Sequence, residues 1–272
     1  MRTKKLEDYL AWIGLLALGT VAVALGSFPE PFRCLFAASF CILLIVSRLV
    51  LQLRRYTRVL DALFIVVLIW MLPLMPFYAE FHSLGKEPFF LIFGRSDLVD
   101  EVASNSMGGF FWILLPVVLV FIERDSLKDI FLTRGKTVGW SVGAAVLLVL
   151  MAVASIVVLT SGLQAGTYLA SVPLGLTFAL INAVKEEVLY RGLILGRTLR
   201  FGFRFALLCQ LVWFVLIHML YAGGGRSIGM MIGIAFFALV ASWMTWKTES
   251  VAFAVQAHTG IDFMIFAASI PR

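Results

Sequence analysis

The chain has 272 residues, of which 61% are hydrophobic and only 14% are charged, and its mean hydropathy is +0.99. Soluble globular domains carry about 25% charged residues, so this composition excludes a soluble enzyme, a soluble nucleic-acid-binding domain and a disordered chain. The net charge of +6 does not indicate a nucleic-acid partner, because most Lys and Arg residues lie in short clusters between apolar runs. Such clusters set the orientation of a membrane protein, and we therefore expect an all-α, polytopic protein of the lipid bilayer.

Apolar runs long enough to cross a membrane recur along the whole chain. A transmembrane helix needs about 20 predominantly apolar residues. The runs predict eight or nine such helices, near residues 9–26, 34–53, 59–78, 109–122, 140–160, 171–196, 204–222, 228–246 and 251–269. The first run follows a basic stretch, as in a signal peptide, but it is long and no A-x-A cleavage site follows it, so we expect a retained helix.

The basic residues predict that the N-terminus is cytoplasmic and the C-terminus lies outside. Cytoplasmic segments would then carry Lys247 and the clusters at 2–5, 54–58, 124–136 and 197–204. The opposite side would carry Arg33, Lys86, Arg95, Arg226 and Arg272. This excess follows the positive-inside rule. The compact, Arg-flanked chain looks prokaryotic, and we expect it in a prokaryotic cytoplasmic (inner) membrane.

Two polar segments interrupt the apolar runs. Residues 79–108 contain several acidic residues and are predicted to be a solvated outer connector, with a lid or substrate-docking loop as the alternative. Residues 123–137 alternate charged and apolar side chains at helical spacing, which predicts an interfacial helix. By function we divide the chain into an N-terminal transmembrane region, 1–108, and a core, 109–272.

Ionisable residues lie deep inside three of the predicted spans. Glu186 and Glu187 are in the sixth span, and Asp262 is in the ninth. His218 and His258 are mid-span in the seventh and ninth. A carboxylate at the centre of a transmembrane helix costs about 2.5–3.5 kcal/mol even on insertion-based scales. These residues are therefore candidates for function.

Helical spacing sorts the acidic pair in the sixth span. Glu187 and Arg191 are four residues apart and share a helix face, which favours an internal ion pair. Glu186 points about 100° away from Glu187. One carboxylate can therefore be held by Arg191 while the other stays available for chemistry.

The same spacing of four residues recurs in the seventh and ninth spans. Phe214 precedes His218 by four residues, and His258 precedes Asp262 by four, so that this acid can orient the imidazole. Counting about 1.5 Å per residue, His258 lies about 10–12 Å from the cytoplasmic face. We expect the three spans to meet near mid-membrane, at a site that leans toward the cytoplasm.

The three motifs together resemble a family signature. Glu186-Glu187-x-x-x-Arg191, Phe214-x-x-x-His218 and His258-x-x-x-Asp262 are similar to the EExxxR, FxxxH and HxxxN/D motifs of the CPBP family, the type II CAAX prenyl endopeptidases and bacteriocin-processing (Abi) proteins. The resemblance covers about residues 171–268. It implies a glutamate-dependent intramembrane endopeptidase that uses no cofactor and no metal.

The resemblance also implies a role for each motif residue. Glu186 would be the general base that takes a proton from water, and His218 would help to position that water. His258 and Asp262 would polarise the substrate carbonyl, while Glu187 and Arg191 support the site. Asp262 stands where many relatives have Asn, and an ionised carboxylate cannot donate to an oxyanion. It is therefore either protonated or serves only to orient His258.

Other interpretations use the same residues. Glu186, His218 and His258 are potential zinc ligands, although no HExxH motif is present. The cluster can also be a structural interhelical hydrogen-bond network, or part of a proton relay. The main alternative is a non-catalytic membrane protein that binds a partner or confers bacteriocin immunity.

A substrate protein and the bilayer are the partners that the resemblance implies. We expect a membrane or membrane-tethered protein, cleaved near its C-terminal tail or membrane segment. Candidates are proteins with sorting signals, CAAX-like proteins and bacteriocin precursors. The sequence predicts no oligomeric state.

Overall fold

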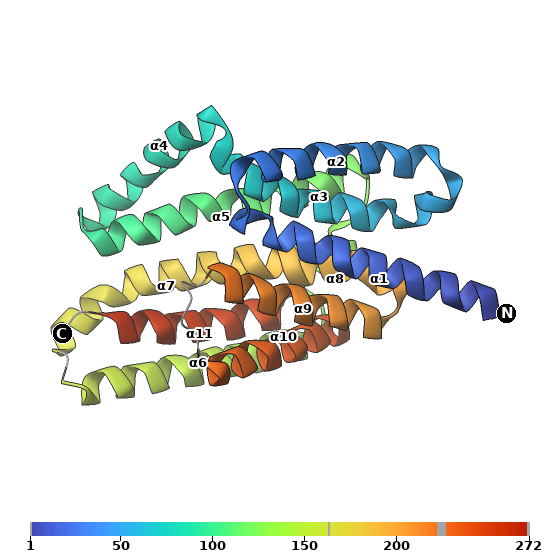
Figure 1. The fold of residues 1–272 in the computed structure, drawn as a ribbon. Coiled ribbons are helices and arrows are strands. Elements are labelled where there is room, and N and C mark those ends of the chain that lie inside the picture. The colour runs from blue at the N-terminus through green and yellow to red at the C-terminus, as the bar shows by residue number, and fades with distance from the viewer. Residues whose placement is uncertain (1, 163, 222–226, 271–272) are drawn as a thin grey trace. The chain divides into compact units, whose positions relative to one another are not determined.

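The computed structural model describes residues 2–162, 164–221 and 227–270, and every regular element in these residues is helical (Figure 1). Eight of the described helices are long and apolar enough to cross a membrane. They are Leu10–Ser27, Glu30–Leu49, Leu53–Leu74, Asp97–Ile122, Thr137–Thr160, Ala165–Phe201, Phe203–Leu220 and Ile228–Thr248. Each overlaps one of the first eight predicted spans, which confirms a polytopic helical membrane protein. Of the outer basic residues predicted above, Arg226 and Arg272 lie outside the described residues.

The ninth predicted span is helix α11 (Ala252–Ser269). It is not among the eight helices that meet the criteria of length and apolarity. Gln256, His258 and Asp262 lie within it and lower its mean hydropathy. The residues that make α11 a functional candidate are thus the ones that weaken it as a membrane span.

The chain folds into two compact units, each made of two stretches. The first comprises Met1–Met75 and Leu193–Trp243, and the second comprises Pro76–Gly192 and Met244–Arg272. These units are defined by packing, so the functional division at residue 108 stays a prediction.

The first unit contains helix α9 (Phe203–Tyr221), the helix that carries His218. Helix α1 (Arg2–Ala24) packs against α9 and α3 (Thr57–Met71), and α2 (Glu30–Leu49) packs against α3. The four-residue helix α8 (Leu195–Thr198) packs against both α3 and α9. Trp213 anchors α9, because its indole is buried against Gly19 and its Nε1 donates to the carbonyl of Leu16 at 3.3 Å.

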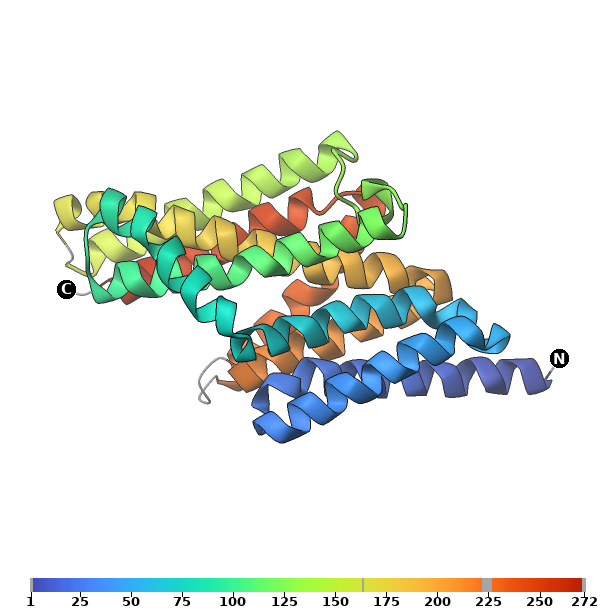
Figure 2. The same cartoon turned by 90° about the horizontal axis from the view of Figure 1, so that it is seen from above.

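The second unit contains the acidic motif and the last histidine. Helix α11 lies between α6 (Thr137–Thr160) and α7 (Ala165–Glu187), α5 (Asp97–Ile122) packs against α7, and α4 (Pro76–Phe93) packs against α5 (Figures 1 and 2). Helix α10 (Ile228–Thr248) belongs to the first unit up to Trp243, and its last residues lead into α11. The order of packing places α7 and α11 side by side, although they are far apart in the sequence.

Glycines let α11 approach its neighbours closely. A Cβ atom on Gly260 would lie 2.8 Å from the side chain of Leu150 in α6, and one on Gly175 of α7 would lie 2.4 Å from the ring of Phe266. Small residues at helix interfaces permit this close approach. In a membrane it matters because lipid tails are as apolar as the side chains, so van der Waals packing and not the hydrophobic effect drives helix association. The close packing of α11 fixes the positions of its polar side chains.

Gly143 in α6 offers a test of this packing. A Cβ atom there would lie 3.0 Å from the backbone Cα of Phe253 and 2.2 Å from Oε1 of Gln256, so α11 itself has to move. We expect Gly143→Ala to lower the free energy of unfolding by about 1–3 kcal/mol, as overpacking does. Gly166→Ala in α7 is the control, because nothing lies within 4 Å of its added Cβ. Equal midpoints for the two variants, in unfolding by SDS in mixed micelles, would contradict the close packing.

The predicted solvated connector at 79–108 is wrong, because this segment is helical. It contains most of α4 and the first half of α5. Ser96 caps α5 by accepting from the backbone N–H of Val99 at 3.3 Å. Val99, Val102 and Ala103 recur at helical spacing and are buried. The acidic residues between them hid this apolar face.

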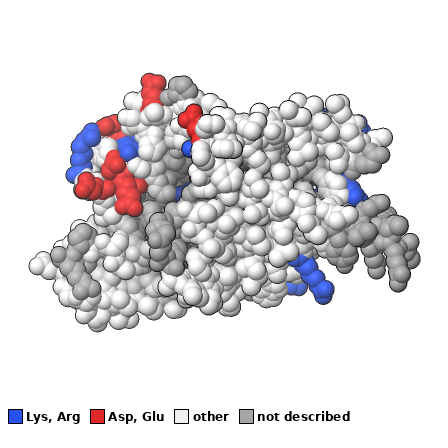
Figure 3. Space-filling model, in the orientation of Figure 1, with Lys and Arg blue, Asp and Glu red and all other residues white. Residues whose placement is uncertain are grey.

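Charged side chains gather at the end of the second unit, over α4 and the start of α5 (Figure 3). One ion pair joins the two helices, with Nζ of Lys86 in α4 at 3.0 Å from Asp100 in α5. A second pair joins α4 to the connection between the helices, with Nη2 of Arg95 at 2.9 Å from Glu87. Charged residues of this segment therefore pair with one another, within α4, α5 and the connection between them.

The predicted interfacial helix at 123–137 is also wrong. Only one short 3-10 turn forms, Leu127–Ile130, closed by a capping box between Ser126 and Asp129. Phe131 then adopts a left-handed φ of 54°, which ends the turn. Its carbonyl accepts from the backbone N–H of Val251 at 3.2 Å. This segment is a linker tied to the start of α11, since hydrogen bonds to distant backbone replace those of a helix.

Candidate active site

The acidic motif lies where α7 changes its helical geometry. Glu186 and Glu187 end α7, and the following seven residues, Val188–Ile194, form a π-helix that contains Arg191. π-Helical turns are rare and are frequent at functional sites. The turn is buried, with Leu189, Tyr190 and Leu193 at most 1% exposed. The motif is thus held in the core of the protein rather than on a lipid-facing surface.

Glu187 and Arg191 form the ion pair that their spacing predicts. Nη1 of Arg191 donates to Oε1 of Glu187 at 3.0 Å, and neither side chain is exposed. A buried charge without its partner is costly, so each of these residues requires the other. Glu186, one position earlier, is 15% exposed at its side chain. It is the more accessible of the two carboxylates.

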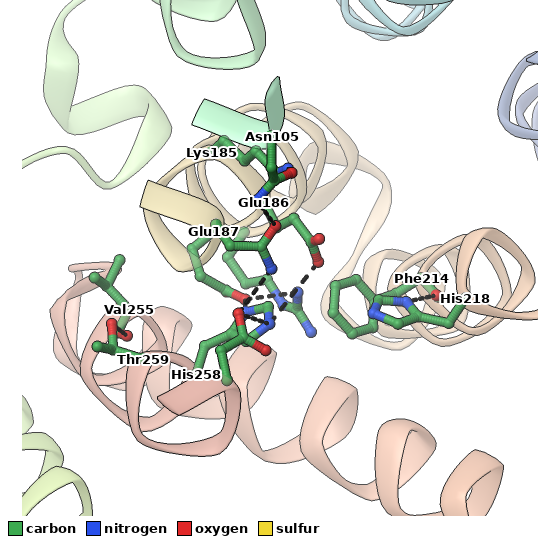
Figure 4. Close-up of polar contacts among 12 residues, drawn as sticks. Asn105, Lys185, Glu186, Glu187, Phe214, His218, Val255, His258 and Thr259 are labelled. Atoms are coloured by element: carbon green, nitrogen blue, oxygen red, sulfur yellow. Dashed lines mark hydrogen bonds and ion pairs between the residues drawn. The ribbon is translucent and has the colours of Figure 1, made fainter. Parts of the chain in front are cut away.

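His258 of α11 reaches across to this pair (Figure 4). Its Nδ1 lies 2.8 Å from Oε1 of Glu187. Because an ionised carboxylate only accepts hydrogen bonds, Nδ1 carries the hydrogen of this bond. The other ring nitrogen, Nε2, lies 3.5 Å from Oδ2 of Asp262 and 3.9 Å from Oε2 of Glu186. Glu187 is therefore the acid that orients the imidazole most directly, where the sequence pointed to Asp262.

Asp262 is bound by residues that the sequence analysis did not single out. Nδ2 of Asn182 donates to Oδ2 of Asp262 at 2.7 Å. Oδ1 of Asn182 accepts from Nδ2 of Asn105 at 3.4 Å, and Oδ1 of Asn105 accepts from the ammonium of Lys185. Lys185 is 8% exposed in the core between α7 and α5. A lysine deep in a span is a recognisable signal, but Asn105 lay in the segment predicted to be a solvated connector.

The charges of this cluster nearly balance. Glu186, Glu187 and Asp262 supply three carboxyl groups, and Lys185 and Arg191 supply two cationic groups. One additional proton, on His258 or on Asp262, makes the cluster neutral. Neutrality matters here because a net charge removed from water is costly unless it is paired.

The structure brings together five of the predicted site residues in the second unit: Glu186, Glu187, Arg191, His258 and Asp262. Phe214 and His218 belong to the first unit and contact each other there. Nδ1 of His218 lies 2.8 Å from the carbonyl of Phe214, and their rings are 4.4 Å apart between centroids (Figure 4). Because a carbonyl oxygen only accepts, Nδ1 donates this bond.

Zinc requires three or more suitable side chains around one point. Among the residues that the structure describes, no group of three or more His, Cys, Asp or Glu side chains is arranged to hold a metal ion.

Residues 168–264 match a family model described as type II CAAX prenyl endopeptidase Rce1-like. Searches of curated proteins and of solved structures found no match. The matched stretch contains the acidic motif, the Phe214–His218 motif and the His258–Asp262 motif. Together with the eight apolar helices it indicates a membrane-embedded protease that acts on protein substrates. Residues 168–264 thus form an Rce1-like segment, as the three motifs indicated.

Proposed function

We propose that this protein is a glutamate-dependent intramembrane endopeptidase with Glu186 as its general base. The observation that carries the proposal is the contrast between two adjacent carboxylates. Glu187 is fully buried and committed to Arg191 and His258, whereas Glu186 is partly exposed and lies 3.9 Å from Nε2 of His258. A general base must reach the proton that it removes, and Glu186 is the carboxylate of the pair with access.

The proposed reaction is the hydrolysis of a peptide bond. Glu186 takes a proton from a water molecule while the water oxygen bonds to the carbonyl carbon. The carbonyl oxygen becomes an oxyanion, and His258 in its doubly protonated form stabilises it by donating a hydrogen bond from Nε2. The C–N bond then breaks, and Glu186 returns the proton to the leaving amine. In this proposal His218 helps to position the water, the role that the family resemblance implies for it.

Glu187 and Arg191 support this chemistry without contacting the substrate. The bond from Nδ1 of His258 to Glu187 fixes the ring, so that Nε2 points toward Glu186 and Asp262. A histidine is effective in catalysis when a partner sets which nitrogen carries the hydrogen. The substrate in this proposal is a membrane or membrane-tethered protein cut near its C-terminal tail or membrane segment, such as one with a sorting signal, a CAAX-like end or a bacteriocin precursor sequence.

The test compares protein C-termini in the native host for the wild type and for Glu186→Gln, by terminal-peptide mass spectrometry. The variant preserves the size of the side chain and removes the base, so we expect at least one membrane or surface protein to keep its C-terminal tail in this strain. The matched control is Glu249→Gln. Its carboxylate is half exposed and lies 3.4 Å from Nζ of Lys136, a surface pair that contributes about 0–1 kcal/mol.

The control strain is expected to show the same termini as the wild type, and the levels of both variants are checked by immunoblot. If no terminus differs between the wild type and Glu186→Gln at equal protein levels, the endopeptidase proposal is wrong. The non-catalytic partner-binding or immunity function then becomes the better interpretation.

A further inference from the structure

A line of hydrogen bonds leads from Lys185 to Asp262 across three helices. Lys185 donates to Asn105 of α5, Asn105 donates to Asn182 of α7, and Asn182 donates to Asp262 of α11. Three of these residues are absent from the motifs that identify the family segment. Their arrangement nevertheless ends on the carboxyl group whose role the sequence left open.

The direction of this line is set at its first residue. An ammonium group can only donate, so Oδ1 of Asn105 must face Lys185 and its Nδ2 must point away. Asn182 then has to accept with Oδ1 and to present its own Nδ2 to Asp262. Each amide is held in one of its two orientations by the residue before it. The last amide of the line, that of Asn182, therefore donates from Nδ2 to Asp262.

Three residues of helix α5 contact the Lys185 side chain and hold it in place. Asn105, Gly109 and Trp112 lie on one face of α5 because they are spaced by four and three residues. The ammonium is bound by Asn105 and lies 5.7 Å from the centre of the Trp112 ring. The aliphatic part of the side chain lies against Gly109, where an added Cβ atom would be 2.8 Å from Cδ of Lys185. Because Gly109 has no side chain, the aliphatic part of Lys185 fits against α5.

We propose that Lys185, Asn105 and Asn182 are positioning residues that hold Asp262 as a carboxylate facing Nε2 of His258, so that Asp262 serves His258 and does not donate to the substrate carbonyl. Hydrogen bonds to a charged acceptor are about twice as strong as those between neutral groups. The donor at the end of this line therefore stabilises Asp262 more strongly as a carboxylate than as a neutral carboxyl group. Lys185 also supplies an opposite charge in the same buried cluster.

The consequence for the reaction follows from the charges. With Asp262 ionised, the cluster holds three carboxylates against Lys185 and Arg191, and a proton on His258 makes it neutral. His258 then donates from Nδ1 to Glu187 and keeps a second N–H at Nε2. This N–H is the donor that the proposed function assigns to the oxyanion, so the inference rests on that function for its role in catalysis.

Infrared difference spectroscopy on the purified protein tests the charge of Asp262 without any substrate. We subtract the spectrum of Asp262→Asn from that of the wild type. The difference is expected to contain a lost carboxylate stretch and no lost C=O stretch of a protonated carboxyl group. The same subtraction in an Asn182→Leu background is expected to show the protonated C=O stretch, because the donor to Asp262 is gone. A protonated carboxyl group in the wild type would overturn the proposal.

Kinetics on the substrate found by mass spectrometry test the positioning role. Gly109→Ala removes no polar group, but its added Cβ displaces the Lys185 side chain from its position against α5. We therefore expect kcat to fall about 10–100-fold with KM unchanged. Gly108→Ala is the matched control, because its Cβ meets only the Tyr78 hydroxyl at an ordinary 3.4 Å. Equal kcat values for the two variants would contradict the positioning role. Failure of the endopeptidase proposal would instead appear as unchanged termini in Glu186→Gln, with the infrared result unaffected.

Discussion

Replacing Arg191 by Met is expected to lower the free energy of unfolding by about 3–5 kcal/mol, because the change leaves the buried cluster around Glu187 with one carboxylate more than its cations. Both side chains have no exposed surface, and Nη1 of Arg191 lies 3.0 Å from Oε1 of Glu187. Met has nearly the length of Arg and fills most of the same space. The loss therefore reports the uncompensated charge more than a cavity.

A second change separates these two causes. In Arg191→Met/Glu187→Gln the buried charge is removed, while the Gln carbonyl can still accept from Nδ1 of His258. We expect the double variant to regain most of the stability that the single variant loses. Unfolding by SDS in mixed micelles provides the measurement for both. A double variant as unstable as the single one would show that packing, and not charge, dominates this position.

The matched control for Arg191 is Arg95→Met. Arg95 also forms an ion pair, with Nη2 at 2.9 Å from Oε1 of Glu87, but the two side chains are 68% and 52% exposed. Exposed pairs contribute about 0–1 kcal/mol, since water solvates each charge when its partner is lost. The same substitution is thus expected to have a large effect in the π-helical turn and a small one at the surface.

Replacing His258 by Gln is expected to lower kcat about 10²–10³-fold, the usual loss when one donor to an oxyanion is removed. The imidazole holds its place through Glu187, and Gln cannot keep that bond and present a second donor at the position of Nε2. KM is expected to change little, because the donor acts on charge that develops in the transition state. The measurement uses purified protein and the substrate identified by its retained C-terminal tail.

His82→Gln is the control for this histidine. Its Nε2 lies 3.1 Å from the carbonyl of Ser104, and its ring centroid lies 5.7 Å from that of Tyr78. Neither partner has a role in the proposed reaction. We expect its kcat to match that of the wild type. If His258→Gln kept full activity, the stabilisation of the oxyanion would have to come from another group, and the proposed role of His258 would be wrong.

The sequence predicted helices well where apolar residues formed long, continuous runs. The first eight predicted spans each match a helix that can cross a membrane. The predictions were wrong where polar residues were numerous. At 79–108, acidic residues on one face of α4 and α5 masked a buried face at Val99, Val102 and Ala103. At 123–137, helical spacing was present, but Phe131 and its neighbours bind distant backbone groups instead.

The motif residues could be identified from the sequence because ionisable groups in apolar runs are costly and therefore conspicuous. The spacing of four residues also predicted the contact between Glu187 and Arg191, since both lie on one helix and local geometry is sufficient. The chain by itself thus determined the fold class, the acidic pair and which of its members Arg191 would hold.

Only the tertiary structure decided which partners His258 and Asp262 have. Glu187 orients His258 although 71 positions separate them, and Asn182 binds Asp262 across 80 positions. The position of Lys185 depends on Gly109 and Asn105 of α5, which come near α7 only when the helices pack. Such contacts depend on how helix surfaces fit together, and the periodicity of a single helix contains no information about the face that it will meet.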